Sequence, residues 1–254
     1  MARRWLLACV VALAALMLAS TASIFICREP EQVELAVIEL PFPRLKGGVS
    51  VEEAIARRRS IRSYRDVPLT LEQLSQILWA AQGITEPKRR FRAAPSAGAT
   101  YPLEVYVVVG EGGVKGLRAG VYRYDPLRHV LVMVKEGDLR AKLSEAALGQ
   151  PWVRSAPVCL VIAADYSRTT GRYGERGIRY VHMEAGHVGQ NVYLEATALG
   201  LGTVAVGAFR DEEVKSLLGI LEDPLYIMPI GVPKATYELK EEDLRAFYER
   251  MRKG

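Results

Sequence analysis

Apolar side chains recur every three or four residues in several stretches of this chain, which is the spacing of one face of an α-helix. The longest such stretch covers residues 180–199, where the apolar positions are Val181, Ala185, Val188, Val192, Ala196 and Leu199. Shorter helices are predicted at residues 51–58, 71–82, 138–148, 211–218 and 238–251. The first two begin with capping boxes, Ser50 to Glu53 and Thr70 to Gln73, whose side chains satisfy free N–H groups.

Continuous runs of apolar and β-branched residues predict buried strands at 105–109 and 157–164. Residues 121–124 and 130–134 flank Asp125-Pro126 and predict a hairpin, and 203–206 and 225–232 complete the expected sheet. Residues 168–179 are polar and contain glycine, so we expect a loop there. Helices mixed with hairpin-connected strands favour an α+β fold, in which a mainly antiparallel sheet is flanked by helices.

The N-terminal segment has a different pattern. Residues 5–26 carry no charge and, as a helix, would extend about 33 Å, enough to span the hydrocarbon core of a bilayer. Arg3 and Arg4 precede this run, a bias that places the N-terminus in the cytoplasm and the rest of the chain outside. We therefore predict a signal anchor or signal peptide at 1–27, a tether or edge segment at 28–48 and a folded domain at 49–254 that is membrane-anchored or exported. The arginine pair also resembles a twin-arginine export signal.

Composition narrows the classes of function. The formal net charge is +5 and there is no long basic tract, so nucleic-acid binding is not expected. The histidines and cysteines are scattered along the chain without a ligand spacing, so no metal site is expected. No Gly-x-Gly-x-x-Gly motif follows a predicted strand, which argues against a Rossmann nucleotide site.

Cationic and hydroxyl donors are concentrated just beyond the first predicted helix, at Arg58, Arg59, Ser60 and Arg62. Arginine forks together with a hydroxyl are the donors that best hold a phosphate dianion. Side chains alternate where the chain is extended, which could turn Arg59 and Arg62 to the same side. The alternative interpretation of this run is a solvated basic edge.

Residues 93–99 have almost no side-chain bulk, and their centre reads Pro95, Ser96, Ala97 and Gly98. Such a loop lets the backbone lie against a flat ring, with N–H groups facing the acceptors of that ring. The alternative is a tight turn before the strand at 105–109. A phosphate site and a ring site in one chain favour a phosphorylated aromatic cofactor.

These two stretches are followed by two further motifs, Gly186-His187-Val188-Gly189-Gln190-Asn191 and Leu199-Gly200-Leu201-Gly202. In this order the four motifs resemble the nitroreductase family of flavoproteins over about residues 49–233. Within that family the chain is most similar to the SagB-type dehydrogenases, whose best-known members oxidise azoline rings in peptide natural products. The resemblance implies a three-layer sandwich, a homodimer and an FMN bound at the dimer interface.

The resemblance also implies roles for particular residues. Arg58, Arg59, Ser60 and Arg62 would hold the FMN phosphate and ribityl chain, and residues 95–98 would cover the ring from the partner subunit. Gln150 would lie against the flavin. Gly207 and Ala208 would lie near the N5 edge, where backbone N–H groups stabilise a reduced, anionic flavin. The late basic residues that bind the phosphate in the family are represented here by Lys234 alone.

The implied activity is transfer of a hydride or electrons through FMN in ping-pong order. NADH or NADPH would be the electron donor and a small organic molecule the acceptor. Alternatively, an organic molecule would itself be the donor. Arg172 and Tyr173 occupy the positions of a Lys-Tyr pair that abstracts a proton in azoline-oxidising relatives. Arginine stays protonated and cannot be a general base, which leaves Tyr173 as the candidate catalytic residue beside that cation. The alternatives are a membrane-tethered flavin-binding module without turnover and a purely structural anchored protein.

Overall fold

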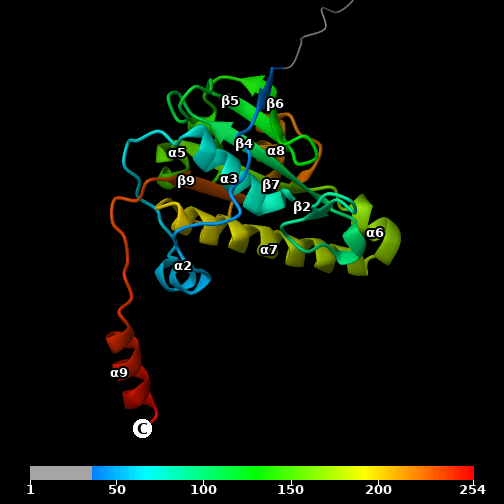
Figure 1. Ribbon diagram of the computed structural model, residues 1–254. Helices are drawn as coiled ribbons and strands as arrows, with labels where there is room; N and C mark the ends of the chain where they lie inside the picture. The colour runs from blue at the N-terminus through cyan, green and yellow to red at the C-terminus, as the bar shows by residue number, and fades with distance from the viewer. Residues whose placement is uncertain (1–35) are drawn as a thin grey trace, which may run out of the picture. The chain divides into compact units, whose positions relative to one another are not determined.

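The computed structural model describes residues 36–254. Seven strands form one sheet in the order β1-β6-β5-β4-β7-β9-β8 (Figure 1), and all neighbouring pairs are antiparallel. The strands of this sheet are β1 (Val37–Glu39), β4 (Leu103–Val109), β5 (Gly120–Asp125), β6 (Val130–Glu136), β7 (Val158–Ala164), β8 (Gly202–Thr203) and β9 (Asp223–Gly231). A separate hairpin pairs β2 (Ile84–Glu86) with β3 (Phe91–Arg92).

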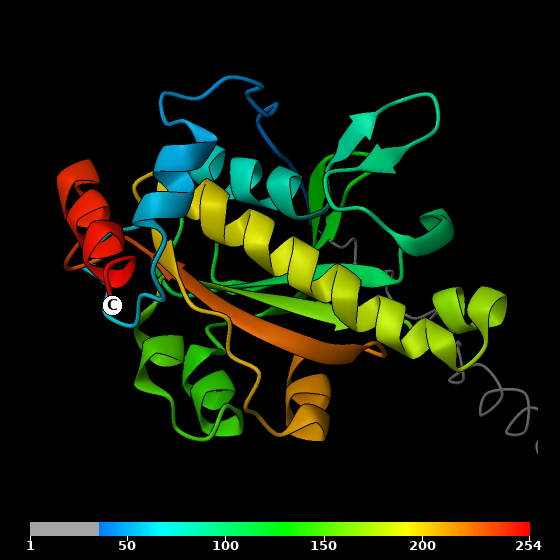
Figure 2. The same ribbon diagram turned by 90° about the horizontal axis from the view of Figure 1, so that it is seen from below.

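Helices cover both faces of the sheet, which makes three layers. The helices of residues 36–254 are α2 (Val51–Arg57), α3 (Leu71–Gln82), α4 (Arg140–Ala146), α5 (Pro151–Ser155), α6 (Ser167–Tyr173), α7 (Arg176–Ala198), α8 (Asp211–Leu218) and α9 (Glu241–Met251). Figure 2 shows α3 and α7 on one face and α4, α5 and α8 on the other. Side chains of β4 alternate accordingly, with Val105 and Val107 in the core under α3 and α7 and Tyr106 and Val108 in the other core. The predicted α+β sandwich is confirmed.

The two predicted capping boxes are present and fix the start of their helices. Ser50 Oγ accepts from the Glu53 N–H at 3.2 Å, and the Ser50 N–H donates to the Glu53 carboxylate at 2.9 Å. Thr70 and Gln73 make the same pair of bonds at 3.2 and 2.9 Å. Helix α3 ends at Gln82, before Gly83, as predicted.

The expected loop at 168–179 is wrong. Helix α6 covers Ser167–Tyr173 and α7 begins at Arg176, so the long helix starts earlier than the predicted residue 180. The Asp165 carboxylate accepts from the Ser167 N–H at 3.0 Å at the start of α6, and Gly174, with φ of 58°, ends it. Thr169 is the one buried residue of α6. A seven-residue helix with a single buried side chain shows no apolar period in its sequence, which is why the pattern predicted a loop.

Other differences are smaller. The strand expected at 203–206 is reduced to Gly202–Thr203, and Val206 pairs with Ile227 in an isolated bridge. Helix α5 and the β2-β3 hairpin were not expected, because each is too short to show a period.

The segment expected to be a tether or edge contributes a strand to the sheet, because β1 pairs with β6 at its edge. The predicted leader at 1–27 lies outside the described residues. Within residues 36–254, no helix combines the length and the apolar character needed to cross a membrane. At the other end of the chain, α9 buries none of its residues.

Candidate functional site

The arginine segment, residues 58–62, leaves α2 in an extended conformation. Arg58 has φ of −55° and ψ of 123°, and Ser60 pairs with Thr203 of β8 in a parallel bridge. The Ile61 N–H donates to the Thr203 carbonyl at 2.9 Å. Because an extended chain turns successive side chains to opposite sides, even and odd positions of this segment face different neighbours.

The even positions of the segment contact aromatic side chains. The guanidinium carbon of Arg58 lies 5.2 Å from the ring centroid of Tyr193 on α7, and that of Arg62 lies 5.5 Å from the ring of Trp152 on α5. Ser60 Oγ lies 3.0 Å from Tyr193 Oη. Among residues 36–254 no carboxylate forms an ion pair with Arg58 or Arg62. Both positive charges are therefore available to an anionic ligand.

Arg59 faces elsewhere, so the expectation that it shares a side with Arg62 is wrong. Its Nη1 donates to the carbonyls of Ala56 and Arg58 at 3.0 and 2.7 Å, and its guanidinium stacks over the ring of Tyr237 at 3.6 Å. Arg59 and Tyr237 line a cavity of about 300 Å³ beside the C-terminal segment. The odd position thus contacts the C-terminal segment, because residues three apart in an extended chain point to opposite sides, which the expectation overlooked.

Gln150 and Ala208, which lie far apart in the sequence, meet beside the arginine segment. Gln150 is the residue before α5, and its Nε2 donates to the Ala208 carbonyl at 2.8 Å. Gly207 is exposed next to Ala208. Trp152 on α5 contacts Arg62, and its indole N–H is buried without a partner among the described residues. The structure therefore brings Arg62, Gln150 and Ala208 to one side of the molecule, with a free N–H donor among them.

The small-residue loop, residues 95–101, contains the 3-10 turn η1 (Ala97–Ala99) and contacts the end of α6. Arg172 Nη1 donates to the Gly98 carbonyl at 2.9 Å. A Cβ atom at Gly98 would lie 2.5 Å from Tyr173 Oη and 2.7 Å from Arg172 Nη1. Glycine is favoured at position 98 by its φ of 59°, and any larger residue would displace the ends of the Arg172 and Tyr173 side chains.

The same contacts place Arg172 and Tyr173 at the loop rather than at the arginine segment. The Arg172 guanidinium lies 5.4 Å from the Tyr173 ring, which packs edge-on against Tyr180 at 5.2 Å. Arg172 is therefore engaged with the Gly98 carbonyl and an aromatic face. Neither of these contacts makes Arg172 able to act as a base.

Within one chain the loop and the arginine segment meet different parts of α7. The side chain of Ser96 lies near the Glu184 carboxyl group, whereas Ser60 Oγ contacts Tyr193 Oη. These two helix positions are separated by about 14 Å along the helix axis, at about 1.5 Å per residue.

A buried polar cluster lies beneath the loop, and sequence reasoning did not find it. Glu184 is 2% exposed, and burial raises the pKa of its carboxyl group, an effect that the nearby polar side chains of Ser96 and Gln82 oppose. Arg92 donates to Gln82 Oε1 at 3.1 Å and stacks over Tyr101 at 4.5 Å. The cluster supports the loop from the side of the core.

Tyr193 and Trp152 are the other residues that the sequence did not single out. Each lies on a helix face among apolar neighbours and is indistinguishable by pattern from a core aromatic. Their roles depend on the extended path of residues 58–62 across β8, which brings the arginines to them. Trp152 lies two residues after Gln150, a candidate site residue, and this proximity in the sequence could have indicated it.

The sequence and the fold of this chain are similar to those of known proteins. A family model described as the nitroreductase family matches residues 55–232. The nitroreductase-like protein MJ1384 of Methanocaldococcus jannaschii is 52% identical over 194 residues, which are 76% of this chain and 96% of that protein. An FMN reductase of Bacillus subtilis that uses NAD(P)H is 29% identical over 193 residues, covering 71% of this chain and 63% of the relative. The crystal structure of a nitroreductase-like protein from Ralstonia eutropha JMP134 has a TM-score of 0.69 and 32% identity, covering 78% of this chain and 90% of that one.

Proposed function

Because the chain belongs to the nitroreductase family, we propose that it is an FMN-dependent oxidoreductase that works as a homodimer. NADH or NADPH is the proposed electron donor and a small organic molecule the acceptor. The observation that carries this proposal is the cluster of Arg58, Ser60 and Arg62, beside the amide of Gln150, whose two arginines form no ion pair with a carboxylate of residues 36–254.

The donors on this side of the molecule fit a flavin phosphate and ring. Arg58 and Arg62 supply two guanidinium groups and Ser60 a hydroxyl, the set that a phosphate dianion binds best. The Trp152 N–H is buried without a partner in the described chain, and Gln150 is held by the Ala208 carbonyl. We assign the phosphate and ribityl chain to the three residues of the arginine segment, and the ring edge to Gln150, Gly207 and Ala208.

The partner subunit supplies the small-residue loop in this proposal. In one chain the loop and the arginine segment meet α7 at positions about 14 Å apart along its axis, and we assign the loop that covers the ring to the second copy, as the family resemblance implies. A second copy related by a two-fold axis would place its residues 95–98 over the ring. The exposed face of α7, which includes His187 and Gln190, is the surface proposed for this contact.

Bound FMN supplies reversible hydride and electron transfer. The contribution of the chain is electrostatic and positional. Arg58 and Arg62 would hold the phosphate, and the backbone N–H groups of Gly207 and Ala208 would stabilise the negative charge that develops on reduction. Gln150 orients this turn through its 2.8 Å bond to the Ala208 carbonyl.

Azoline oxidation is disfavoured, because Arg172 replaces the lysine of the Lys-Tyr pair that abstracts a proton in azoline-oxidising relatives and leaves Tyr173 alone as a candidate base. Arg172 keeps its proton, and its Nη1 donates to the Gly98 carbonyl. The proposed reaction is therefore reduction of a quinone, a nitroarene or a free flavin by NADH or NADPH. The name of the Bacillus subtilis relative supports this class.

The test is the visible spectrum of the purified full chain in mild detergent, with FMN added and excess removed. We expect a flavin spectrum that NADH or NADPH bleaches and that a quinone or nitroarene restores. Bleaching that no acceptor reverses would instead support a flavin-binding module without turnover. Protein that stays colourless would refute FMN binding, and a monomer by sedimentation that still holds FMN would refute the two-copy site.

A further inference from the structure

Three residues of the small-residue loop have a left-handed backbone. The φ angles are 59° at Gly98, 54° at Ala99 and 46° at Tyr101. Residues with a Cβ atom adopt this region rarely, because the Cβ approaches the following carbonyl. Such conformations persist where the surrounding structure holds them in place. Ala99 and Tyr101 therefore require contacts from outside the loop.

Helix α6 provides these contacts from three side chains within little more than one turn. Its side chains meet the loop in antiparallel order: Arg168 Nη1 donates to the Tyr101 carbonyl at 3.1 Å, Thr169 Oγ1 lies 2.8 Å from Thr100 Oγ1, and Arg172 Nη1 donates to the Gly98 carbonyl at 2.9 Å. Positions 168 and 172 are one turn apart and lie on the same helix face. The loop is thus fastened along its length to the helix that carries Tyr173.

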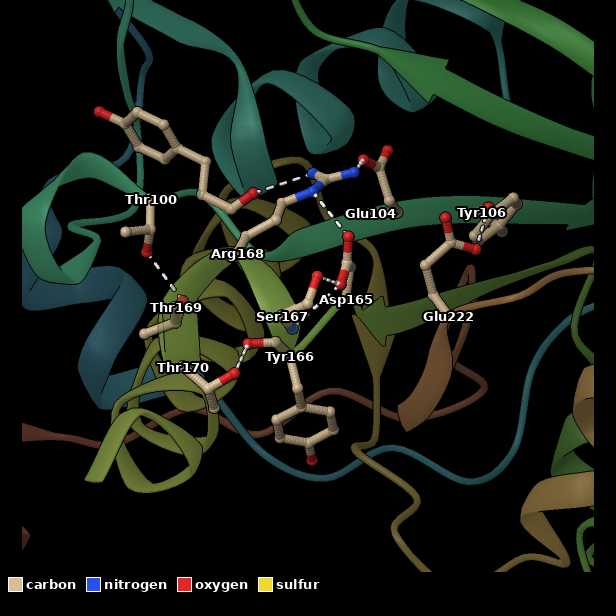
Figure 3. Close-up of polar contacts among 11 residues, drawn as sticks. Thr100, Glu104, Tyr106, Asp165, Tyr166, Ser167, Arg168, Thr169, Thr170 and Glu222 are labelled. Carbon is tan, nitrogen blue, oxygen red and sulfur yellow. Dashed lines mark hydrogen bonds and ion pairs between the residues drawn. The ribbon is translucent and has the colours of Figure 1, made fainter. Parts of the chain in front are cut away.

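Arg168 has the most connections of the three. Its guanidinium donates to the Tyr101 carbonyl and forms ion pairs with two carboxylates, Glu104 at the start of β4 and Asp165 after the end of β7. Figure 3 shows Arg168 between these two carboxylates. The ion-pair distances are 2.7 Å to Glu104 and 3.2 Å to Asp165. Glu104 is the less exposed of the two carboxylates, at 13% of its side chain. One planar group therefore joins the loop, the ends of two central strands and the start of α6.

We propose that Arg168 is a positioning residue, which locks residues 95–101 onto α6 so that the loop, Arg172 and Tyr173 form one rigid unit. The fork of the guanidinium is essential, because three acceptors in different directions must be met at once. The consequence for acceptor binding rests on the proposed function, in which this unit covers the flavin ring of the partner subunit. The consequence for the loop itself does not.

The first test follows hydrogen exchange in the full chain without added flavin. The reporters are the amides of Ala99, Thr100 and Tyr101, which donate to Ser96 O at 3.1 Å, Ala97 O at 3.3 Å and Ser96 Oγ at 2.9 Å. In Arg168→Met and Arg168→Lys these amides are expected to exchange at least about tenfold faster than in the wild type. Arg118→Met is the matched control, because Arg118 forms an exposed ion pair with Glu136 away from the loop.

The result for Arg168→Lys decides whether the planar guanidinium group is needed or a positive charge alone is sufficient. If Arg168→Lys retains wild-type exchange, a point charge is sufficient and the proposal fails. Unchanged exchange in Arg168→Met also overturns it. Should Arg168→Met not fold, Thr169→Val removes only the middle contact, and exchange at Thr100 is expected to rise about threefold. Unchanged exchange at Thr100 in that variant would contradict the proposal that α6 locks the loop.

The second test uses turnover. In Arg168→Lys we expect the KM for a quinone acceptor to rise about tenfold, while the Kd for FMN changes by less than about twofold, because the phosphate contacts are unaltered. Equal losses in FMN affinity and in acceptor KM would show a general structural role and overturn the assignment. If the wild type binds no flavin, the proposed function fails, while the exchange result still decides whether Arg168 locks the loop onto α6.

Discussion

A pair of arginine substitutions tests the division of the arginine segment most directly. Arg62→Met removes a guanidinium that has no carboxylate partner within residues 36–254 and that lies 5.5 Å from the Trp152 ring. Arg59→Met removes one that donates to two carbonyls of its own segment and stacks on Tyr237. The two variants remove the same charge from positions three residues apart. Any difference between them therefore reports where each side chain points.

The magnitudes follow from these contacts. A hydrogen bond from a charged group contributes about 1.5–3 kcal/mol, so loss of Arg62 from the phosphate is expected to raise the Kd for FMN roughly 10- to 150-fold. Loss of Arg59 removes a charge that acts on the phosphate only through space. Solvent and salt screen such charges beyond about 8 Å, and we expect less than a threefold change. The loss of its stacking on Tyr237 costs about 0.5–1 kcal/mol of stability at most.

The assay is quenching of FMN fluorescence on titration with the apoprotein, at low and at physiological salt. The salt dependence of the Kd is expected to weaken in Arg62→Met and to remain in Arg59→Met, because one phosphate contact is lost in the first variant only. Circular dichroism controls for folding. Equal losses of affinity in the two variants would refute the alternation argument, and an unchanged Kd in Arg62→Met would refute the phosphate site.

Three further predictions concern the loop, the site and its buried acid. Gly98→Ala is expected to lower stability by about 1–2 kcal/mol in thermal unfolding, because φ is 59° there; an unchanged Tm contradicts this. Tyr193→Phe is expected to cost about 1–3 kcal/mol in urea unfolding, since the Ala205 N–H donates to Tyr193 Oη at 2.8 Å; equal midpoints contradict it. Burial raises the pKa of Glu184 above 4.5, so its stabilising contribution is complete below pH 4.5 and is lost as pH rises through the folded pKa. Glu184→Gln should therefore gain stability relative to the wild type as pH rises from 4.5, and a constant difference would count against this.

Much of the fold could be predicted because its signals are local. The capping boxes at Ser50 and Thr70 specify helix starts by hydrogen bonds that span three residues, and both are present. The apolar run of β7 reads as a strand because every one of its residues is buried between two helical layers. Helix α6 was missed for the opposite reason. Its contacts are polar and join segments distant in sequence, so they leave no period in its own residues.

The candidate site could be predicted as a set of residue types but not as a geometry. The arginines and the small-residue loop are visible in the sequence, yet the side to which each arginine points depends on where α2 ends. Arg58 is the C-cap of α2, and the extended path starts there. Tyr193, Trp152 and Glu184 gain their roles from neighbours brought by tertiary packing, which no local pattern encodes.

Position 172 shows how packing and chemistry are connected in this chain. The Gly98 carbonyl faces α6 because the loop has a left-handed backbone, and Arg172 donates to it while its guanidinium lies 5.4 Å from the Tyr173 ring. A planar fork satisfies both contacts, whereas an ammonium group meets an acceptor from a single point. The group that holds the loop is therefore one that cannot accept a proton. Hydride transfer from a nicotinamide through a flavin to a quinone or nitroarene removes no proton from carbon by a protein base. Arginine at position 172 is therefore compatible with this reaction class, whereas the Lys-Tyr pair of azoline-oxidising relatives lacks its lysine here.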